Sequence, residues 1–352
     1  MKLIKALVLI GGIAVLWGCA SQSEQTSNEI KTSVIGFDKP REVHYFPDYI
    51  EALKHYAKTQ GINDKTIEIA FTDVHFVEHV VQADKNQPEK KSTLDEYLTR
   101  AVSPTRIKLA QQKYLEFHDQ IRNATLLTHV PQTYILALWG VESGYGKYQG
   151  KEDIISALST LAFEGRRETF FTKELMSALT ILQNGHIEKS QFKGSWAGAM
   201  GQNQFMPSSY LAYGLDGDGD GVIDIWNNMS DVFASTANYL ATVGWQANEG
   251  WGNKIKLPDN FDSQLAGLDN DKVRAVSEWL KTGITFSDSK AKPNNNTQAW
   301  VIIPDVGSGQ GYLVYRNFRT LMHWNRSYPF AISVGMLADS LTDDSLNNTE
   351  GN

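Results

Sequence analysis

One apolar segment constrains this chain more than any other. Pro131 is followed by a mostly apolar run from Gln132 to about Ser143, and proline is favoured at the start of a helix. The run therefore predicts a strongly apolar helix. The run ends close to Glu142, with glycines at 144 and 146 directly behind it.

The carboxyl of Glu142 is the first candidate for chemistry. Ile135, Leu138 and Trp139 share its helix face, so the group stands at the end of an apolar stripe. Loss of water around a carboxyl raises its pKa and keeps it protonated near neutral pH. A glycosidic oxygen needs such a proton donor in order to leave. The alternative is a glutamate that turns to solvent at a helix end, and this segment alone does not decide between the two.

A glycine-rich segment from Gly194 to Ser208 is the second candidate. Its glycines and alanines allow the backbone to approach a flat ligand closely. Gln204 offers both a donor and an acceptor to amide or hydroxyl groups. Trp196, Phe205 and Met206 are suited to packing on sugar faces. The alternative is an ordinary tight loop around an aromatic residue of the core.

Composition narrows the class of partner. The chain has 352 residues, 41% of them hydrophobic and 11% aromatic, which is typical of a folded protein with a sizeable core. Its formal net charge of −7 argues against nucleic acid, because a phosphate backbone needs a basic surface. No phosphate-binding glycine loop and no zinc spacing is present. His75 and His79 stand four apart, which is best interpreted as a half-buried helix face.

The N-terminus has the pattern of a secretory leader. Lys2 and Lys5 make a short positive region, and residues 3–17 are otherwise apolar. This apolar run is too short for a membrane span and is typical of a signal peptide. Cys19 follows it and is the one cysteine of the chain, so it has no internal disulfide partner. The stretch resembles a bacterial lipobox and predicts lipidation of Cys19. Neither Ala20 nor Ser21 is an aspartate, which favours an outer-membrane lipoprotein facing the periplasm. A plain signal peptide with an incidental cysteine is the alternative.

An acidic loop predicts a metal site. Asp216, Asp218 and Asp220 alternate with glycines, and Gly221 takes the sixth position, as at the opening of an EF-hand calcium loop. The twelfth position is Asn227 instead of a bidentate glutamate, which departs from the common pattern. Asp231 could alternatively be a first-turn residue at a helix start, with Ser230 as N-cap. The role predicted for a bound Ca²⁺ is structural.

Two motifs together carry a family resemblance. They are Glu142-Ser143-x-Tyr145-Gly146 and Gly198-Ala199-Met200-Gly201-x-x-Gln204-Phe205-Met206-Pro207-Ser208. In this order and at this separation they resemble the lytic murein transglycosylase B family, and Asp231, Ala237, Asn238 and Tyr239 fit it as well. The similarity runs from about residue 40 to 340.

The resemblance implies a fold and a reaction. The expected fold is mainly α (α+β), with a lysozyme-like core, a helical domain and a small β domain. Glu142 would protonate the oxygen between N-acetylmuramic acid and N-acetylglucosamine. It would then deprotonate the muramyl 6-hydroxyl, which attacks its own anomeric carbon and leaves a 1,6-anhydromuramyl end. The substrate's N-acetyl group would assist, so neither a second carboxylate nor an organic cofactor is expected.

The resemblance also implies site residues. Ser195, Met200, Gln204 and Tyr239 would line the cleft, and Arg166 and Arg167 would lie near the peptide stem or a carboxylate. A solvated helix face is the alternative for the two arginines. The implied calcium ligands are Asp216, Asp218, Asp220, the Val222 carbonyl and Asp231. The chain departs from some members at two positions, because Trp324 and Phe330 stand where they carry cleft tyrosines.

The sequence therefore predicts an organisation and leaves three functions open. The expected parts are a signal peptide over 1–18, a flexible tether over 19–40, a mainly helical domain over 41–130, a catalytic core over 131–250, a small β domain over 251–315, a helical return over 316–341 and a disordered tail over 342–352. We expect a monomer that acts on peptidoglycan glycan strands. A hydrolytic muramidase of similar fold and a non-catalytic murein-binding lipoprotein are the alternatives to a lytic transglycosylase.

Overall fold

The computed structural model describes residues 33–86, 93–305 and 309–341, and these residues are mainly helical. The α-helices are α1 (Phe46–Thr59), α2 (Asp64–Phe71), α3 (Glu78–Lys85), α4 (Leu94–Ala101), α5 (Pro104–Glu116), α6 (His118–Thr128), α7 (Gln132–Ser143), α8 (Ile154–Glu164), α9 (Glu168–Gln183), α10 (Pro207–Tyr213), α11 (Met229–Thr242), α12 (Val276–Lys281), α13 (Arg316–Trp324) and α14 (Tyr328–Asp339). The strands are β1 (Glu152–Asp153), β2 (Lys193–Gly194), β3 (Gly252–Lys256), β4 (Arg274–Ala275), β5 (Thr285–Phe286), β6 (Gln298–Ile302) and β7 (Gln310–Val314). The expected mainly α class with a small β part is confirmed.

Helix α7 is buried along most of its length. Every side chain from Tyr134 to Trp139 is buried, and Gly140 is buried with them. The helix packs against α14, α11, α5 and α6, which surround it. It begins and ends at the residues that the sequence predicted. Glu142, one residue before the end of α7, is therefore held by a helix that is largely enclosed.

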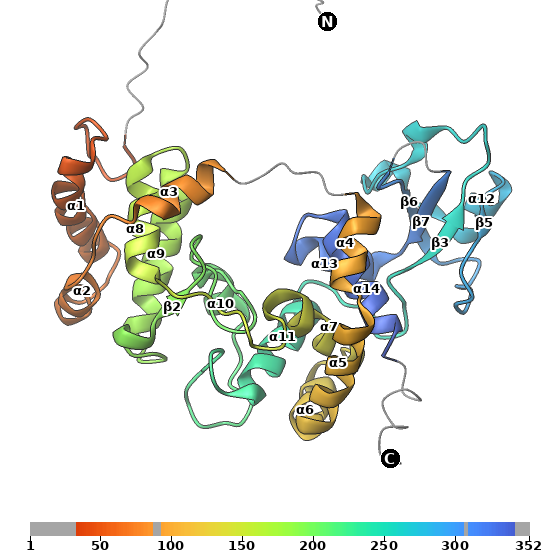
Figure 1. The fold of residues 1–352 in the computed structure, drawn as a ribbon, viewed down its shortest axis with the longest axis horizontal. Helices are drawn as coiled ribbons and strands as arrows, with labels where there is room; N and C mark the ends of the chain where they lie inside the picture. The colour runs from red at the N-terminus through yellow and green to blue at the C-terminus, as the bar shows by residue number, and fades with distance from the viewer. Residues whose placement is uncertain (1–32, 87–92, 306–308, 342–352) are drawn as a thin grey trace, which may run out of the picture. The chain divides into compact units, whose positions relative to one another are not determined.

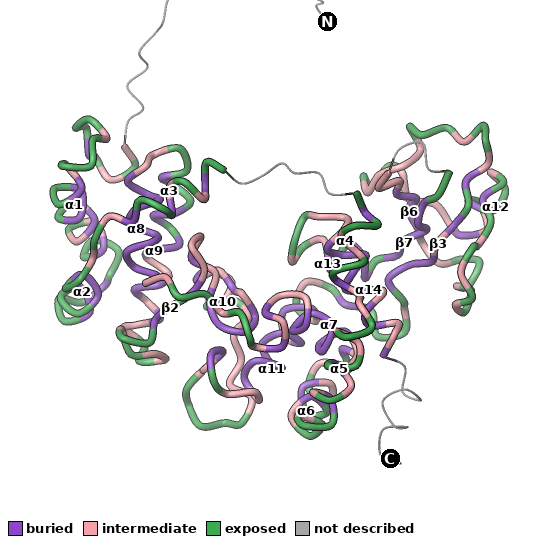
Figure 2. Tube along the Cα trace, viewed as in Figure 1, coloured by how far each residue is buried: buried purple, intermediate pink, exposed green. Residues whose placement is uncertain are grey.

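The other helices gather in two groups (Figures 1 and 2). The helices α1, α2 and α3 pack on α8 and α9, and all residues of α8 from Ile154 to Phe163 are buried. The helix α4 instead packs on α14, near the other end of the chain, while α5 and α6 contact α7. How these groups relate to the expected helical domain and catalytic core stays a prediction.

The small sheet is antiparallel, with strand order β4-β6-β7-β3-β5. Successive side chains of a strand point to opposite faces, and both faces of this sheet are covered. Trp300 and Ile302 of β6 join the main hydrophobic core. Ala299 and Val301 join a second core with Trp279 of α12. Burial on both faces explains why these strands are continuously apolar in the sequence.

Several local expectations differ from the structure. The helix α10 lies within residues 190–230, whose Gly, Ser and Asp content predicts ordered loops, and α12 follows β4 inside the expected small β domain. The stretch from Asp84 to Ser92 predicts a loop because it holds Pro88 and three lysines, but Asp84 belongs to α3. Asn228 caps α11, because its side chain accepts the N–H of Ser230. The idea that Ser230 is the N-cap is therefore wrong.

The chain ends lie outside this description. The expected signal peptide, Cys19 and the tail from residue 342 are not among the described residues. Within the described ranges, no helix combines the length and the apolar character needed to cross a membrane.

Candidate active site at the end of helix α7

Glu142 and Trp324 form the centre of the candidate site. Glu142 is half-buried in the last turn of α7, and the indole N–H of Trp324, at the end of α13, donates to its Oε1 over 2.7 Å. Burial raises the pKa of the Glu142 carboxyl to about 8, although the indole hydrogen bond acts in the opposite direction. The carboxyl is therefore protonated at neutral pH, as a general acid must be.

The turn after α7 has an unusual backbone. Gly144, Tyr145 and Gly146 have positive φ values of 60°, 61° and 82°. Tyr145 is one of few non-glycine residues in this left-handed region, which costs conformational energy. Its ring packs so closely on Gly140 that a Cβ at that position would lie 2.5 Å from it. The tight turn fixes the end of α7, and Glu142 with it.

The glycine-rich segment is tied to α7 through Gln202. Its Oε1 accepts the indole N–H of Trp139 over 2.8 Å, and its Nε2 donates to the Trp226 carbonyl over 2.9 Å. The neighbouring Gln204 has a positive φ of 51°. Its Nε2 donates to the Gly201 carbonyl over 2.8 Å. This leaves its side-chain oxygen as the acceptor that a ligand can use.

Aromatic rings connect this segment and α11 to the Glu142 site. The ring of Trp324 lies 4.5 Å from that of Tyr239 and 5.2 Å from that of Phe205, measured between centroids. The hydroxyl of Tyr239 donates to the carbonyl of His323 over 3.0 Å. Tyr239 is thus brought close to Glu142 at the end of α7, although 97 positions separate the two residues in the sequence.

The other expected cleft residues make their contacts with parts of the chain other than Glu142. Ser195 is half-buried, and its Oγ accepts the N–H of Ala199 over 2.9 Å, so it shapes the loop. Met200 is fully buried. Arg166 and Arg167 both form ion pairs with Asp84 of α3, whose side chain is almost inaccessible. The arginine pair is therefore engaged by a buried carboxylate of this chain.

Two neighbours of the site were missed by the sequence interpretation. Arg106 of α5 donates to the carbonyl of Gly140 over 2.7 Å and so holds the last turn of α7. Tyr97 of α4 has a raised pKa, mainly through burial and then through the charge of Glu142. Neither residue belongs to a motif, and no local pattern sets them apart from other residues of amphipathic helices.

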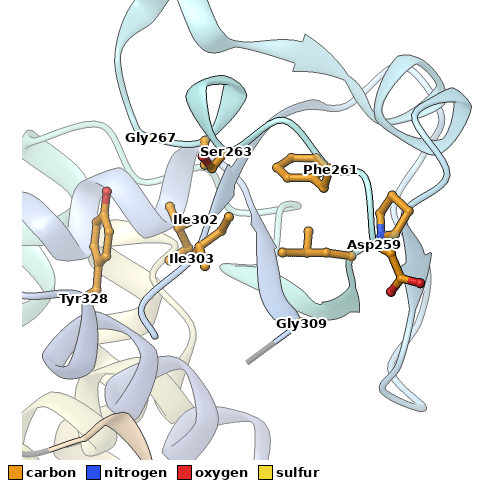
Figure 3. Close-up of a pocket in the computed structure, with 11 residues that line it drawn as sticks. Asp259, Phe261, Ser263, Gly267, Ile302, Ile303, Gly309 and Tyr328 are labelled. Atoms are coloured by element: carbon orange, nitrogen blue, oxygen red, sulfur yellow. The ribbon is translucent and has the colours of Figure 1, made fainter. Parts of the chain in front are cut away.

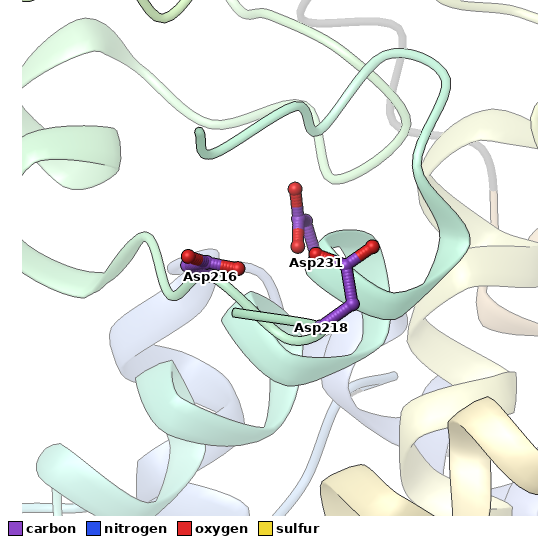
Figure 4. Close-up of side chains that lie close together, drawn as sticks. All are labelled: Asp216, Asp218 and Asp231. Carbon is purple, nitrogen blue, oxygen red and sulfur yellow. The ribbon is translucent and has the colours of Figure 1, made fainter. Parts of the chain in front are cut away.

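The acidic loop forms a separate cluster (Figure 4). Carboxylate oxygens of Asp216, Asp218 and Asp231 lie within 4.8 Å of one another. Asp231 is fully buried and accepts the N–H groups of Gly217 and Asp224 over 2.8 and 2.7 Å. Burial raises its pKa to about 6, and the charges of Asp218 and Asp216 add to this increase.

This donor set is suited to a hard divalent cation. Three converging carboxylates repel one another, and calcium prefers oxygen ligands of this kind. Asp220 differs from the expected ligand set, because its Oδ1 accepts the N–H of Val222 over 2.8 Å. Val222 itself is partly exposed at the loop surface.

A pocket of about 660 Å³ lies beside the small sheet (Figure 3). It is mostly apolar and has Phe261, Ile302 and Tyr328 among its lining residues. None of the site residues expected from the sequence contributes to it.

Comparison with known proteins places this geometry in a family. Residues 45–339 match the Transglycosylase SLT domain family. Membrane-bound lytic murein transglycosylase B of Escherichia coli strain K12 is 32% identical over 249 residues, which cover 70% of this chain. The aligned region covers 66% of that relative, slightly under two thirds of its length.

Solved structures agree in fold. SltB3 from Pseudomonas aeruginosa in complex with NAG-NAM-pentapeptide has a TM-score of 0.80 and 37% identity, covering 84% of this chain and 79% of that one. Escherichia coli lytic transglycosylase Slt35 in complex with calcium has a TM-score of 0.71 and 25% identity, covering 91% and 98% of the two chains. The lysozyme-like fold expected from the two motifs is thereby confirmed. The chain belongs to the Transglycosylase SLT domain family of lytic transglycosylases.

Proposed function

We propose that this protein cleaves the MurNAc-β-1,4-GlcNAc bond of peptidoglycan and forms 1,6-anhydroMurNAc ends. The observation that carries the proposal is the carboxyl of Glu142, whose pKa burial raises to about 8. Family membership supports the same reaction. SltB3, a relative by structure, has been solved with NAG-NAM-pentapeptide and with NAG-anhNAM-pentapeptide.

In the proposed reaction Glu142 acts first as acid and then as base. It gives its proton to the glycosidic oxygen, and it then takes the proton of the muramyl 6-hydroxyl as that oxygen bonds to the anomeric carbon. The pKa of Glu142 is set by burial and by the hydrogen bond from Trp324, with no contribution from another carboxylate among the described residues. This supports a single-carboxylate reaction over one with a second acidic nucleophile.

We infer that Ser195, Met200, Gln204 and Tyr239 form the binding surface around Glu142. Tyr239 reaches it through Trp324, and Gln204 has an acceptor to offer. Met200 would act by filling the space behind the surface, because it is fully buried. Arg166 and Arg167 keep exposed faces that are suited to a carboxylate of the peptide stem.

Muropeptide analysis tests the proposal. Purified sacculi are incubated with the form lacking residues 1–19, and the released products are identified by mass spectrometry. Products lighter by one water than hydrolytic ones are expected. Reducing ends would instead identify a muramidase, and binding without any release would identify a murein-binding protein.

We also propose that the loop around Asp216, Asp218 and Asp231 holds a structural Ca²⁺. The three converging carboxylates support this, as does the calcium complex of Slt35. Asp220 and the Val222 carbonyl remain the predicted further ligands, and Asp220 would have to exchange its backbone partner for the ion. The ion would hold the loop against the start of α11 and would take no part in the reaction.

Finally, we propose that Cys19 carries a lipid that anchors the enzyme at the outer membrane, facing the periplasm. The sequence pattern supports this, and the Escherichia coli relative is membrane-bound. Labelled palmitate is expected to attach to the full chain and not to Cys19→Ala. Membrane retention of Cys19→Ala would contradict the anchor. The expected monomeric state and the expected division of the chain into domains belong to the same proposal.

A further inference from the structure

We propose that Trp324 is a positioning residue that decides which oxygen of Glu142 carries the catalytic proton, by occupying Oε1 and reserving Oε2 for proton transfer. The inference rests on the proposed function. It starts from one contact, in which the indole N–H of Trp324 lies 2.7 Å from Oε1.

The chemistry of the two groups makes this contact selective. A neutral carboxyl has one protonated oxygen and one oxygen that only accepts. An indole N–H donates and never accepts. A hydroxyl oxygen is a much weaker acceptor than a carbonyl oxygen, so the indole donation over 2.7 Å favours the form in which Oε1 is the carbonyl oxygen and the proton resides on Oε2. Among the described residues no hydrogen-bond partner is found for Oε2, which leaves that oxygen available to substrate.

Neighbouring aromatic rings fix the orientation of the Trp324 indole. Its ring packs against those of Tyr239 at 4.5 Å and Phe205 at 5.2 Å. Tyr239 in turn binds the residue before Trp324, because its hydroxyl donates to the carbonyl of His323 over 3.0 Å. Rotation of the indole away from Glu142 would disrupt both ring contacts, so the donor is preorganised.

Selection of one oxygen matters because the reaction uses it twice. The C1–O4 bond breaks with its electron pair going to O4, and O4 takes the proton from Oε2. The muramyl O6 then bonds to C1, and the O6 proton passes to Oε2. Oε1 remains bonded to the indole throughout, so the carboxyl does not need to reorient between its acid and base roles.

The hydrogen bond from Trp324 also stabilises the Glu142 carboxylate that forms between the two steps. Indole donation stabilises the charged form and moderates the increase in the pKa of Glu142 that burial causes. A tyrosine at this position would offer a hydroxyl that can donate or accept. It would therefore suit a proton on either oxygen, whereas the indole of Trp324 favours one.

The charged and titratable groups around Glu142 come from four elements. Arg106 of α5 holds the Gly140 carbonyl, and Tyr97 of α4 has a pKa raised by burial and by Glu142. Burial raises the pKa of Tyr239 on α11 above its ordinary value. The Nδ1 of His323 on α13 contacts the hydroxyl of Tyr239, so His323 needs its own control.

The first experiment is an NMR titration of the indole N–H in the form lacking residues 1–19, labelled with ¹⁵N at tryptophan. The Trp324 signal is assigned as the one that is lost in Trp324→Phe. We expect its shift to move with pH around a midpoint of about 8, because its partner titrates there. The movement should persist in His323→Gln and vanish in Glu142→Gln. A signal that ignores pH, or that titrates unchanged in Glu142→Gln, would overturn the inference.

The second experiment measures rates of anhydromuropeptide release across pH. Trp324→Phe should lower kcat about tenfold with a smaller change in KM, and its alkaline limb should move to higher pH because the moderating hydrogen bond is gone. Trp324→Tyr restores a donor and should recover most of kcat. Trp300→Phe is the matched control, because Trp300 also donates to an oxygen acceptor, the carbonyl of Asp269, but does so from β6.

The outcomes separate this inference from the proposed function. A Trp324→Phe variant with the wild-type rate and pH profile overturns the positioning role and leaves the transglycosylase intact. Wild-type protein that releases no anhydro product overturns the function, while the indole titration still decides whether the Trp324 contact exists. If Trp324→Phe does not fold, the Trp324 signal is assigned by its loss in Trp324→Tyr, and the titration of wild type and Glu142→Gln then decides in the same way.

Discussion

The indole nitrogen of Trp324 lies 2.7 Å from the carboxyl Oε1 of Glu142, although 182 positions separate the two residues in the chain. The acid is supplied by α7, and its partner comes from α13, which follows the small sheet. The catalytic end of α7 is thus completed by a helix that lies outside both sequence motifs.

Replacement of Glu142 by glutamine should abolish turnover and leave binding nearly intact. Glutamine keeps the shape of the side chain and an acceptor for Trp324, but it has no proton to give. We expect the release of anhydromuropeptides to fall by about a thousandfold or more. Co-sedimentation with sacculi should stay close to that of wild type.

The matched control is Glu116→Gln, because the side chain of Glu116 is exposed and its ion pair with Lys113 lies on the surface of α5. This variant should keep the wild-type rate. Near-normal turnover by Glu142→Gln would remove Glu142 from the mechanism.

The same substitution should change how stability depends on pH. The folded pKa of Glu142 is about 8, whereas the ordinary value is 4.5, so between these pH values the folded state binds a proton that the unfolded state lacks. The free energy of unfolding of wild type should therefore decrease as pH rises through this window. Glu142→Gln should gain about 2 kcal/mol on wild type between pH 5 and pH 8. Urea titrations at several pH values measure this difference, and equal slopes would show that Glu142 ionises freely.

The sequence was most informative where the pattern is local. The limits of α7 follow from Pro131 and from an apolar run that has to be buried, and the strands β6 and β7 follow from continuous apolar residues. The contact between Trp324 and Glu142 could not be predicted, because it depends on how α13 returns after the sheet. Tyr97 was missed for the same reason, since α4 reaches the site by packing on α14.

Substitutions on the two sides of the ion pairs between Asp84 and Arg166 and Arg167 should lower the free energy of unfolding by different amounts. The Asp84 side chain is 3% exposed, while those of the two arginines are 47% and 45% exposed. Removing both arginines leaves a buried carboxylate unpaired, which should cost about 3 kcal/mol. Asp84→Asn leaves two arginines that water can solvate, which should cost about 1 kcal/mol. Urea denaturation compares the variants, and a larger loss in Asp84→Asn would refute this explanation.

Calcium should decide whether Asp218→Asn is more or less stable than wild type. Without the ion, Asp218→Asn removes a charge that repels Asp231, so the variant should be at least as stable as wild type in EDTA. With Ca²⁺ at one hundred times its Kd, wild type should gain about 2.7 kcal/mol. The variant should gain much less, because it lacks one ligand.

Thermal melts in EDTA and in Ca²⁺ measure both effects. Asp119→Asn is the control, since the Asp119 side chain is 87% exposed and lies on α6. An equal response to Ca²⁺ in all three proteins would exclude a site in this loop.

The acidic loop also shows where the sequence pattern stopped being informative. The spacing of its aspartates predicted an EF-hand-like opening, and the structure does bring Asp216 and Asp218 to Asp231. The sequence could not predict the orientation of the Asp220 side chain, because that side chain accepts the backbone N–H of Val222, two residues later in the chain. Such short-range bonds depend on φ and ψ values that alternating glycines leave open.

Completion of the site by α13 has a consequence for biosynthesis. A ribosome delivers Glu142 long before it delivers Trp324, and the whole small sheet is made in between. A chain that ends after α7 and before α13 contains Glu142 but lacks the indole of Trp324. If the proposed function and the proposed role of Trp324 hold, full activity is acquired only when the C-terminal helices have packed against α7.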